Sequence, residues 1–488
     1  PVAIPHVSPS ATAPGSRRLD TLYSPYCSRI EPIPKSIYAT VCQLWRMTAD
    51  DCDDCGSPVT RRRVLESIGG AGTLALAGCL GSGGSSTATS SDDESVTIAL
   101  TAPETGHYAP LGEHERDGFE LAVKHLNEGG GLVGDSEYSS LSGDGVLGST
   151  VETAVLDTES SPATTESKVR PRLDGDEFAA FFGGVAGSVA ETNRDLADEY
   201  ETPYFVGSST VNALTGSDCS PHVYRHLFNT TTLARSLVPE IASDVPDEQS
   251  IFHVYADAPE GNDLFQSIND VVTDSDLDWR PTGGISVRPG TTNFESAIND
   301  DILSDVSLVF LDLFGLDAVN AIQWARAALS DDTTVVVPYL TRSVAESLGD
   351  RVAGIYGTVG WHEDLGTPLS GAFGEAYQRE YGTGDAETLA ASGPAQTAYA
   401  QVILYAHAAE RAGSFDAAAI RNELEGLEYA AGAGTQKMRA CDHQSVRSVP
   451  VVRGRARSDS VDDRFELRGA KRGMEPGCEA PPAASCDL

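Results

Sequence analysis

Lysine is scarce in this 488-residue chain, because only five positions carry it: Lys35, Lys124, Lys168, Lys437 and Lys471. Positive charge of any kind is also low, with 34 Lys and Arg against 72 Asp and Glu and a net charge of −38. Such a surface repels nucleic-acid phosphates, so we expect no nucleic-acid partner. Its self-repulsion is strong in dilute buffer and weak at molar salt, where the Debye length is about 3 Å. The composition therefore favours a protein adapted to concentrated brine.

The sequence has only a short apolar run near its beginning, at 64–78. That run is too short to cross a hydrocarbon core of ~30 Å, which excludes a membrane helix there. It follows the pair Arg61 and Arg62 and ends in the letters LAGC, of which the last is Cys79. This order of parts predicts a twin-arginine lipoprotein signal, with a lipid on Cys79 that anchors the exported chain to the outer face of the membrane.

The signal divides the chain into segments with different expected roles. We expect 1–59 to be a disordered extension, 60–79 to be the signal, and 80–94, which is rich in Gly, Ser and Thr, to be a flexible tether. Beyond residue 78 the chain has 26 basic and 65 acidic residues, a net charge of −39. The acidity therefore belongs to the exported part.

The chain has nine cysteines, which fall into groups by their position relative to the predicted signal. Four of them precede the end of the signal. Among these, Cys52 and Cys55 have the spacing of zinc ligands but no second pair at matching spacing, so we expect no metal site. Beyond Cys79 an even number is left, which is compatible with disulfides in an oxidising compartment. These four are Cys219, Cys441, Cys478 and Cys486, and the sequence leaves all three pairings open.

Short apolar runs alternate with longer helical periods from residue 95 onward, which predicts an α/β fold with parallel sheets. We expect strands at 96–103, 151–157, 178–183, 203–207, 250–255, 307–313 and 333–338, and helices at 113–127, 162–173, 188–200, 233–243, 262–273 and 317–329. So many units favour two Rossmann-like lobes. The Ser/Gly/Asp-rich stretch 134–149 predicts a disordered insertion.

Two loops at the carboxyl ends of predicted strands are candidate ligand loops, because ligands of such sheets bind there. Gly187 allows close backbone approach, and Ser188 can cap the helix that follows, so this helix start suits an anion. Ser208, Ser209 and Thr210 offer three consecutive hydroxyls after the next strand. The helix start and the three hydroxyls together suit a zwitterionic ligand.

Further candidates are aromatic or acidic residues at equivalent loop positions: Tyr108, Glu260, Phe314, Tyr339 and Trp361. The sequence has no GxSxG elbow, HExxH motif, P-loop lysine or complete dinucleotide fingerprint. Asp442 and His443 stand beside a predicted hairpin, and we interpret them as structural. We therefore expect neither an enzyme nor a cofactor.

Several ordered segments resemble one family, the branched-chain amino acid and amide-binding proteins of ABC importers. They read ETGHYAPLGEHERDGFELAVKHLNEGGGLVG, VLDTESSPATTESKV, FFGGVAGSVAETNRDLADEYETPYFVGSST and MRACDHQSVRSVPVV. The resemblance implies a type I periplasmic-binding fold, in which two lobes close on a small solute held by loops that match Ser188 and Ser208–Thr210. It identifies the chain as a haloarchaeal-type lipoprotein of that family.

The same resemblance implies lobe boundaries and a hinge of three crossings. The first lobe would comprise 95–227 and 361–437, the second 228–360 and 438–470, with 471–488 as a C-terminal tail. The crossings would fall near His226–Thr231, Tyr356–Trp361 and Lys437–Asp442. It also favours a disulfide between Cys441 and Cys478.

The resemblance implies an extracytoplasmic solute-binding component of an ABC importer, which delivers its ligand to a membrane permease and its ATPase. The alternative function is that of a ligand-sensing receptor domain that acts with a signalling partner. Glu260 and Leu111 stand where the family often has aromatic residues before Gly. These departures argue against leucine-like specificity and leave amino acids, urea and small amides open. A glycosylation sequon at Asn229 is left open too.

Overall fold

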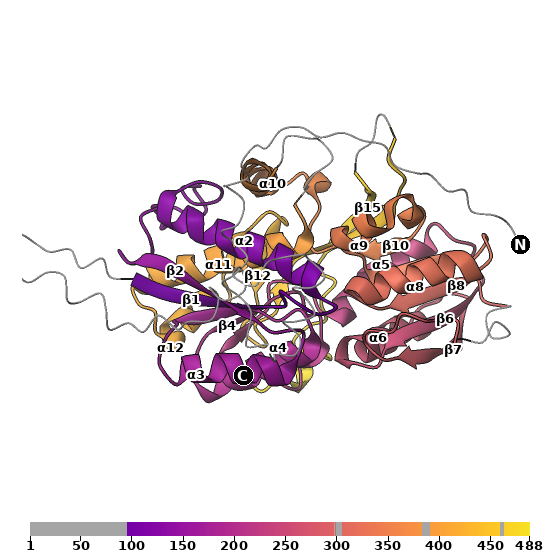
Figure 1. Cartoon of the computed structure of the whole chain (residues 1–488), viewed down its shortest axis with the longest axis horizontal. Coiled ribbons are helices and arrows are strands. Elements are labelled where there is room, and N and C mark those ends of the chain that lie inside the picture. Colours follow the sequence, from indigo (N-terminus) through magenta and orange to yellow (C-terminus); the bar gives the residue numbers. More distant parts are fainter. Residues whose placement is uncertain (1–94, 297, 299–304, 383–390, 459–462) are drawn as a thin grey trace, which may run out of the picture. The chain divides into compact units, whose positions relative to one another are not determined.

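The structure, a computed structural model, describes residues 95–296, 298, 305–382, 391–458 and 463–488 (Figure 1). The expected extension, signal and tether, including Cys79, lie outside these residues. Most of the described chain forms two α/β units, each built around its own sheet. We call them the first lobe and the second lobe.

The first lobe contains a five-stranded parallel sheet in the order β2-β1-β3-β4-β5. Its strands are β1 (Ser95–Ala102), β2 (Thr150–Asp157), β3 (Ala180–Gly183), β4 (Tyr204–Val206) and β5 (Val223–Tyr224). Alternate side chains of β1 point to opposite faces, so that Ile98 and Leu100 pack against α2 (Ala109–Glu128) and α11 (Gly393–Ala412). Ala99 instead joins the core under α3 (Pro162–Leu173) and α4 (Gly187–Glu199). Both faces are thus covered by helices, as a parallel sheet requires.

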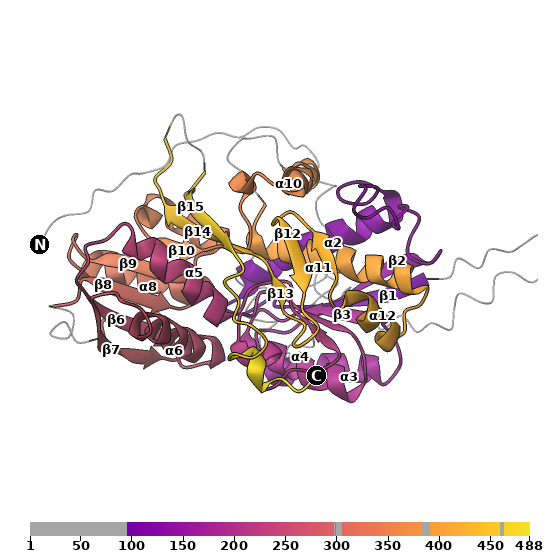
Figure 2. The ribbon, with the colours of Figure 1, turned by 180° about the vertical axis from the view of Figure 1, so that it is seen from behind.

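The second lobe contains a seven-stranded sheet in the order β15-β14-β10-β9-β8-β6-β7. Its strands are β6 (Gln249–Ala256), β7 (Trp279–Val287), β8 (Leu308–Asp312), β9 (Thr334–Tyr339), β10 (Tyr356–Thr358), β14 (Ser448–Gly454) and β15 (Phe465–Arg472). Helices α5 (Thr230–Ala242) and α6 (Pro259–Thr273) pack on one face, and α8 (Gly315–Ala328) and α9 (Arg342–Leu348) on the other (Figure 2). Among the described strands of this sheet, β14 pairs antiparallel with both β10 and β15, and the other pairs are parallel.

A small antiparallel sheet and two further helices complete the described α-helices and β-strands. The sheet has the order β11-β12-β13, with β11 (Glu428–Ala430), β12 (Thr435–Met438) and β13 (Ser445–Val446), and the helices are α10 (Pro368–Tyr381) and α12 (Ala417–Leu424). The fold class is therefore α/β with two lobes, as the alternation of elements predicts.

The chain passes between the two lobes after β5, after β10 and after β13, before the segment that follows β15 returns to the first lobe. The third passage comes later than the expected Lys437–Asp442, because β12 is followed by β13, which pairs with it before the chain enters β14. Arg447 on this passage is fully buried, and its guanidinium donates to the carbonyl of His226 at 3.3 Å and to the carbonyl of Gly360. One side chain therefore ties the three passages together.

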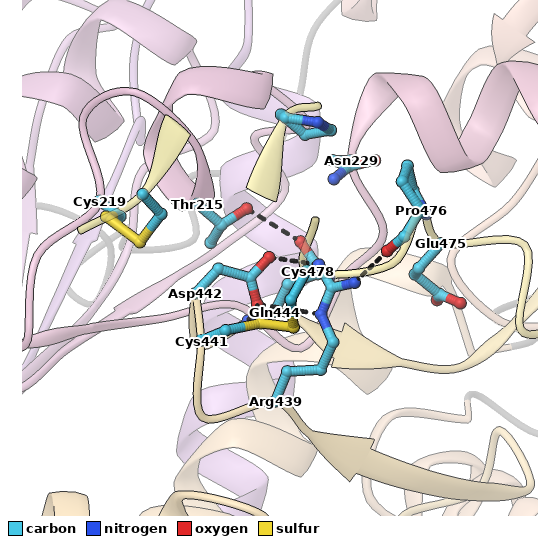
Figure 3. Close-up of polar contacts among 12 residues, drawn as sticks. Thr215, Cys219, Asn229, Arg439, Cys441, Asp442, Gln444, Glu475, Pro476 and Cys478 are labelled. Carbon is cyan, nitrogen blue, oxygen red and sulfur yellow. Dashed lines mark hydrogen bonds and ion pairs between the residues drawn. A yellow bond between two sulfur atoms is a disulfide. The ribbon is translucent and has the colours of Figure 1, made fainter. Parts of the chain in front are cut away.

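The loop before β13 is structural, in line with the interpretation of Asp442 and His443. Gln444 accepts from Arg225 Nε at 2.7 Å and donates to the Leu227 carbonyl at 2.7 Å. The His443 ring stacks on Tyr224, with ring centroids 4.7 Å apart. Asp442 pairs with Arg439 (Figure 3).

The segment after β15, which falls in the expected C-terminal tail, returns to the first lobe. Glu475 accepts from the Arg447 backbone N–H at 2.9 Å, and the Pro476 carbonyl accepts from Arg439 (Figure 3). Two disulfides attach this segment to the first lobe and to the loop before β13: Cys219–Cys486, and Cys441–Cys478, which the resemblance favoured.

One expectation about loops is wrong, and the question of the sequon, which the sequence left open, has an answer in the fold. Residues 134–149 are packed, because Tyr138, Leu141 and Val146 enter the core of the first lobe and the Tyr138 hydroxyl donates to the Ala430 carbonyl at 2.9 Å. The sequon residue Asn229 is fully buried and caps α5 by accepting from the Thr232 N–H at 2.8 Å. A buried cap cannot carry a glycan in this fold.

Candidate functional site between the two lobes

The loop after β4 carries the hydroxyls at the centre of the site. Ser208 donates to Glu115 Oε1 from both its backbone N–H and its hydroxyl, each at 2.7 Å. Ser209, its neighbour, donates to Glu260 Oε1 of the second lobe at 3.1 Å. Thr210 is fully buried, and its hydroxyl has no hydrogen-bond partner. Each of the three predicted hydroxyls thus lies in the interior, and two of them bind carboxylates from opposite lobes.

Glu115 is a site residue that the sequence reasoning missed. It lies on the buried face of α2, four residues after Leu111 and four before Phe119, where a helix normally presents apolar side chains. The side chain is fully buried, and burial raises the pKa of its carboxyl to about 7 against the lowering effect of the two Ser208 hydrogen bonds. A glutamate in an otherwise apolar helical stripe was the available signal.

Glu260 projects from the first turn of α6 into the same region. It is 7% exposed, so it does not face water. A methyl group on Gly187 would come within 2.4 Å of Glu260 Oε1, so a side chain at this position would require the carboxylate to shift. Burial, with smaller contributions from the charges of Glu191 and Asp263, raises the pKa of Glu260 to about 7 against the lowering effect of its hydrogen bonds.

Ser188 has a different place from the one expected. Helix α4 begins at Gly187 with Ala186 as the N-cap, and no side chain caps it. Ser188 is therefore inside the first turn and half-buried, and its carbonyl accepts from the Thr192 hydroxyl at 2.9 Å. The expected capping role is wrong, because the chain enters the helix one residue earlier than the sequence pattern indicates.

Tyr108 and Phe314 meet where α2 and α8 begin. Both residues belong to one apolar cluster that contains side chains of both lobes, and they are 7% and 9% exposed. Gly315 has φ +53°, and a methyl group there would approach the His107 carbonyl to 3.0 Å, so the backbones of the two lobes are in close contact. Burial, followed by the charge of Glu260, raises the pKa of the Tyr108 hydroxyl.

Tyr339 and Trp361 line a small cavity beside the second passage. Its volume is about 10 Å³, which is the space of roughly one water. The lining residues are Tyr339, Thr341, Arg342, Val359, Gly360, Trp361, Ala391, Ser392, Gly393, Pro394 and Phe465. Both the Tyr339 hydroxyl and the Trp361 indole N–H are buried without a hydrogen-bond partner. The Trp361 ring packs on Phe373, so its indole belongs to the first-lobe core.

The lobes also touch through polar groups beside the hydroxyl loop. The Asn212 N–H donates to Asp263 Oδ2 at 2.7 Å, and the Asn212 carboxamide oxygen accepts from the Thr231 hydroxyl at 3.1 Å. Together with the Ser209–Glu260 bond, these contacts describe two lobes closed on each other. In the described residues no group of three His, Cys, Asp or Glu side chains is arranged to hold a metal ion.

Two α/β lobes, three passages and a buried polar contact between the lobes define a two-lobed solute-binding protein. The chain belongs to the periplasmic binding protein family, whose profile matches residues 95–459. No curated protein matches the chain. In the part of the chain that the structure describes, no helix has the length and apolar character needed to cross a bilayer.

Solved structures agree on the fold. An amino acid ABC transporter substrate-binding protein from Pseudomonas fluorescens is 20% identical with a TM-score of 0.70, covering 81% of this chain and 99% of its own. A solute-binding protein from R. palustris in complex with benzoate is 19% identical with a TM-score of 0.66, covering 81% and 100%. A branched-chain amino acid transporter protein from Streptococcus pneumoniae in complex with isoleucine is 17% identical with a TM-score of 0.64, covering 78% and 99%.

Proposed function

We propose that this protein is the extracytoplasmic solute-binding component of an ABC importer, which captures an amino acid or small amide between its lobes. The observation that carries the proposal is the buried polar contact in which Ser208 and Ser209, neighbours on one loop, bind Glu115 of the first lobe and Glu260 of the second. The similar proteins from Pseudomonas fluorescens and Streptococcus pneumoniae, which bear ABC transporter names, support the importer role.

Binding in such a protein makes and breaks no covalent bond. The ligand contributes by interacting more favourably with the closed arrangement than with the open one, since equal affinity for both would shift nothing. The region where the lobes meet offers the hydroxyl of Thr210 and the phenol of Tyr339. It also offers a close approach to the backbone at Gly187. A membrane permease with its ATPase would then receive the ligand from the closed form.

The test of the proposal is calorimetry in 2 M KCl with a panel of amino acids, urea and short amides. Thr210→Ala should weaken binding of whichever ligand binds by about fivefold, because it removes one buried hydrogen bond of roughly 1 kcal/mol. Thr273→Ala, at the exposed end of α6, is the matched control and should leave the affinity unchanged. Failure of the whole panel to bind would contradict the function.

Export and anchoring belong to the same proposal. Arg61, Arg62 and Cys79 stand in the order of a twin-arginine lipoprotein signal. The net charge of −39 beyond residue 78 suits a folded domain that faces brine from a lipid tether on the outer surface of the cell. Cys79→Ser should release the protein from the membrane fraction, whereas Cys55→Ser should not; equal membrane retention of the two would contradict the anchor.

A further inference from the structure

The C-terminal segment, residues 473–488, connects the two lobes once more after the third passage. The chain leaves the second lobe at the end of β15 and runs back toward the first lobe (Figure 2). A disulfide joins Cys486 near its end to Cys219 of the first lobe. Pro482 packs at Gly216 of the same lobe, where a methyl group would come within 2.9 Å of its Cβ atom. The described chain therefore has a fourth crossing, whereas the resemblance implies three.

The beginning of this segment runs beside the third passage. Ser448, where β14 begins, pairs with Arg472, where β15 ends, so the chain enters and leaves the second lobe at the same place. Just beyond this pair, Glu475 Oε1 accepts from the Arg447 N–H of the third passage at 2.9 Å. Two stretches of chain that run in opposite directions thus connect the lobes side by side.

The Cys441–Cys478 disulfide ties these two stretches together on the side of the first lobe (Figure 3). Cys441 lies in the loop before β13, and Gln444 of this loop forms a β-bridge with Arg225, the residue after β5. The loop is thereby part of the first lobe. The stretch from Arg472 to Cys478 can span at most roughly 20 Å. The disulfide therefore keeps the end of β15 close to the first lobe.

The C-terminal segment has little apolar contact with the rest of the protein. Within 473–488, all of which the structure describes, Pro476 and Ala483 are the buried residues. The burial of so little apolar surface does not offset the conformational entropy that is lost when each residue of the segment is fixed. The attachment of the segment therefore depends on its two disulfides.

The second disulfide lies close to the polar contact between the lobes. Cys219 follows the short helix η2 (Asn212–Thr215), and the first residue of that helix binds Asp263 and Thr231 of the second lobe. The C-terminal segment is thus anchored on the same first-lobe loop that touches the second lobe in the closed arrangement.

We propose that the C-terminal segment limits how far the two lobes open, and so holds the ligand-free protein near the closed arrangement. Opening rotates one lobe against the other about the passages. One passage alone is a single bending chain, whereas two cross-linked stretches must bend together, which narrows the range of lobe angles. This inference goes beyond the solute-binding function, because it concerns the protein without ligand. A protein that already populates its closed form binds more tightly than one that is mostly open.

The test measures the separation of the lobes without ligand, so it needs no knowledge of the solute. Spin labels on p-acetylphenylalanine, placed at the exposed positions Asp195 of α4 and Gln266 of α6, leave the cysteines untouched and report the interlobe distance by double electron–electron resonance at molar salt. Cys441→Ser with Cys478→Ser should lengthen the mean distance by more than about 2 Å, as in a hinge motion, and broaden its distribution. An unchanged distribution would overturn the proposal.

A matched variant separates this restraint from a general loss of stability. Cys219→Ser with Cys486→Ser removes a disulfide but leaves Cys478 fastened beside the third passage, so it should lengthen the distance less. A lengthening as large as that of the first double variant would overturn the restraint at the third passage. Thermal unfolding checks that both variants fold. If the disulfides merely stabilise the fold, the unfolding temperature falls while the distance stays the same, which also overturns the proposal.

The wild type gives the same readout without any substitution of cysteine. Cys478 is exposed, so a water-soluble phosphine can reduce its disulfide to two thiols in the folded protein, with the phosphine oxidised to its oxide by oxygen from water. Alkylation and mass measurement of a sample confirm the reduction. The interlobe distance should lengthen on reduction and return on reoxidation. A reduced protein with the distance of the oxidised one would overturn the proposal.

Discussion

Ser209 and Glu260 join the two lobes directly: the serine hydroxyl of the first lobe donates to Glu260 Oε1 of the second at 3.1 Å. Gly187 lies against the same carboxylate, where a methyl group would come within 2.4 to 2.5 Å of all three of its carboxyl atoms. The position of the Glu260 carboxylate therefore combines a hydrogen bond to the first lobe with a close approach to a residue that has no side chain.

Gly187→Ala should oppose closure without harming the fold of either lobe. The added methyl group would displace the Glu260 carboxylate and break its bond with Ser209, while alanine suits the helix start at least as well as glycine. We expect ligand affinity to fall about tenfold, equivalent to about 1.4 kcal/mol. Small-angle scattering with saturating ligand should report more open particles. Gly371→Ala on α10, where a methyl group meets nothing within 4 Å, is the control; equal affinities for the two variants would contradict the steric role.

The raised pKa of Glu115 should make folding stability depend on pH. Its folded pKa is about 7 against an ordinary 4.5, so the native state binds more protons than the unfolded state between these values. The contribution of this carboxyl is therefore most favourable below pH 4.5 and is lost as the pH rises to about 7. Tyr204 and Tyr339, which face it, stay neutral throughout this range because burial raises their pKa values.

Glu115→Gln should remove this dependence. At molar salt the free energy of unfolding of the variant, relative to the wild type, should increase by roughly 3 kcal/mol between pH 4.5 and pH 8, at 1.36 kcal/mol per pKa unit. Chemical denaturation at several pH values measures this difference in the free energy of unfolding. For the control Glu113→Gln, which changes an exposed side chain, the difference should not vary with pH. A flat difference for Glu115→Gln would mean that its carboxyl titrates normally.

The elements of the first half could be predicted closely because their patterns are local. The helix at Pro162–Leu173 begins and ends as predicted, since Pro162 starts it and its buried positions, Thr165, Val169 and Leu173, recur every four residues. By contrast, 134–149 has the composition of a loop, and its order comes from Tyr138, Leu141 and Val146 packing under a helix distant in sequence. Composition alone does not reveal such burial.

The site and hinge were predictable only where a strand end marks them. The hydroxyls of Ser208–Thr210 follow β4 and could be named from the sequence, whereas Glu115 sits in mid-helix and gains its role from a loop 93 positions away. The third passage was misplaced because β13 has two residues and exists only through its pairing with β12. Short strands of this kind carry little local signal.

Arg447→Met should destabilise the hinge. The guanidinium is fully buried and donates to the His226 and Gly360 carbonyls on the other two passages, so its loss leaves buried acceptors unpaired. We expect a loss of about 3 kcal/mol in the free energy of unfolding, seen as a lower midpoint in guanidinium chloride. Arg472→Met, on the exposed part of β15, should cost less than about 0.5 kcal/mol. Similar losses in the two variants would show that Arg447 does not join the passages.

Removal of the Cys441–Cys478 disulfide should loosen the C-terminal segment. The bond closes a loop of 37 residues in sequence and fixes the chain beside the Glu475–Arg447 contact, which the segment makes after leaving β15. Cys441→Ser with Cys478→Ser should cost roughly 2–4 kcal/mol in unfolding free energy. Limited proteolysis should then cleave after residue 472 faster than in the wild type. The variant Cys219→Ser with Cys486→Ser, which frees only the end of the segment, should leave the 473–478 stretch protected, because Cys478 still holds it. Equal cleavage there in both double variants would contradict separate roles for the two bonds.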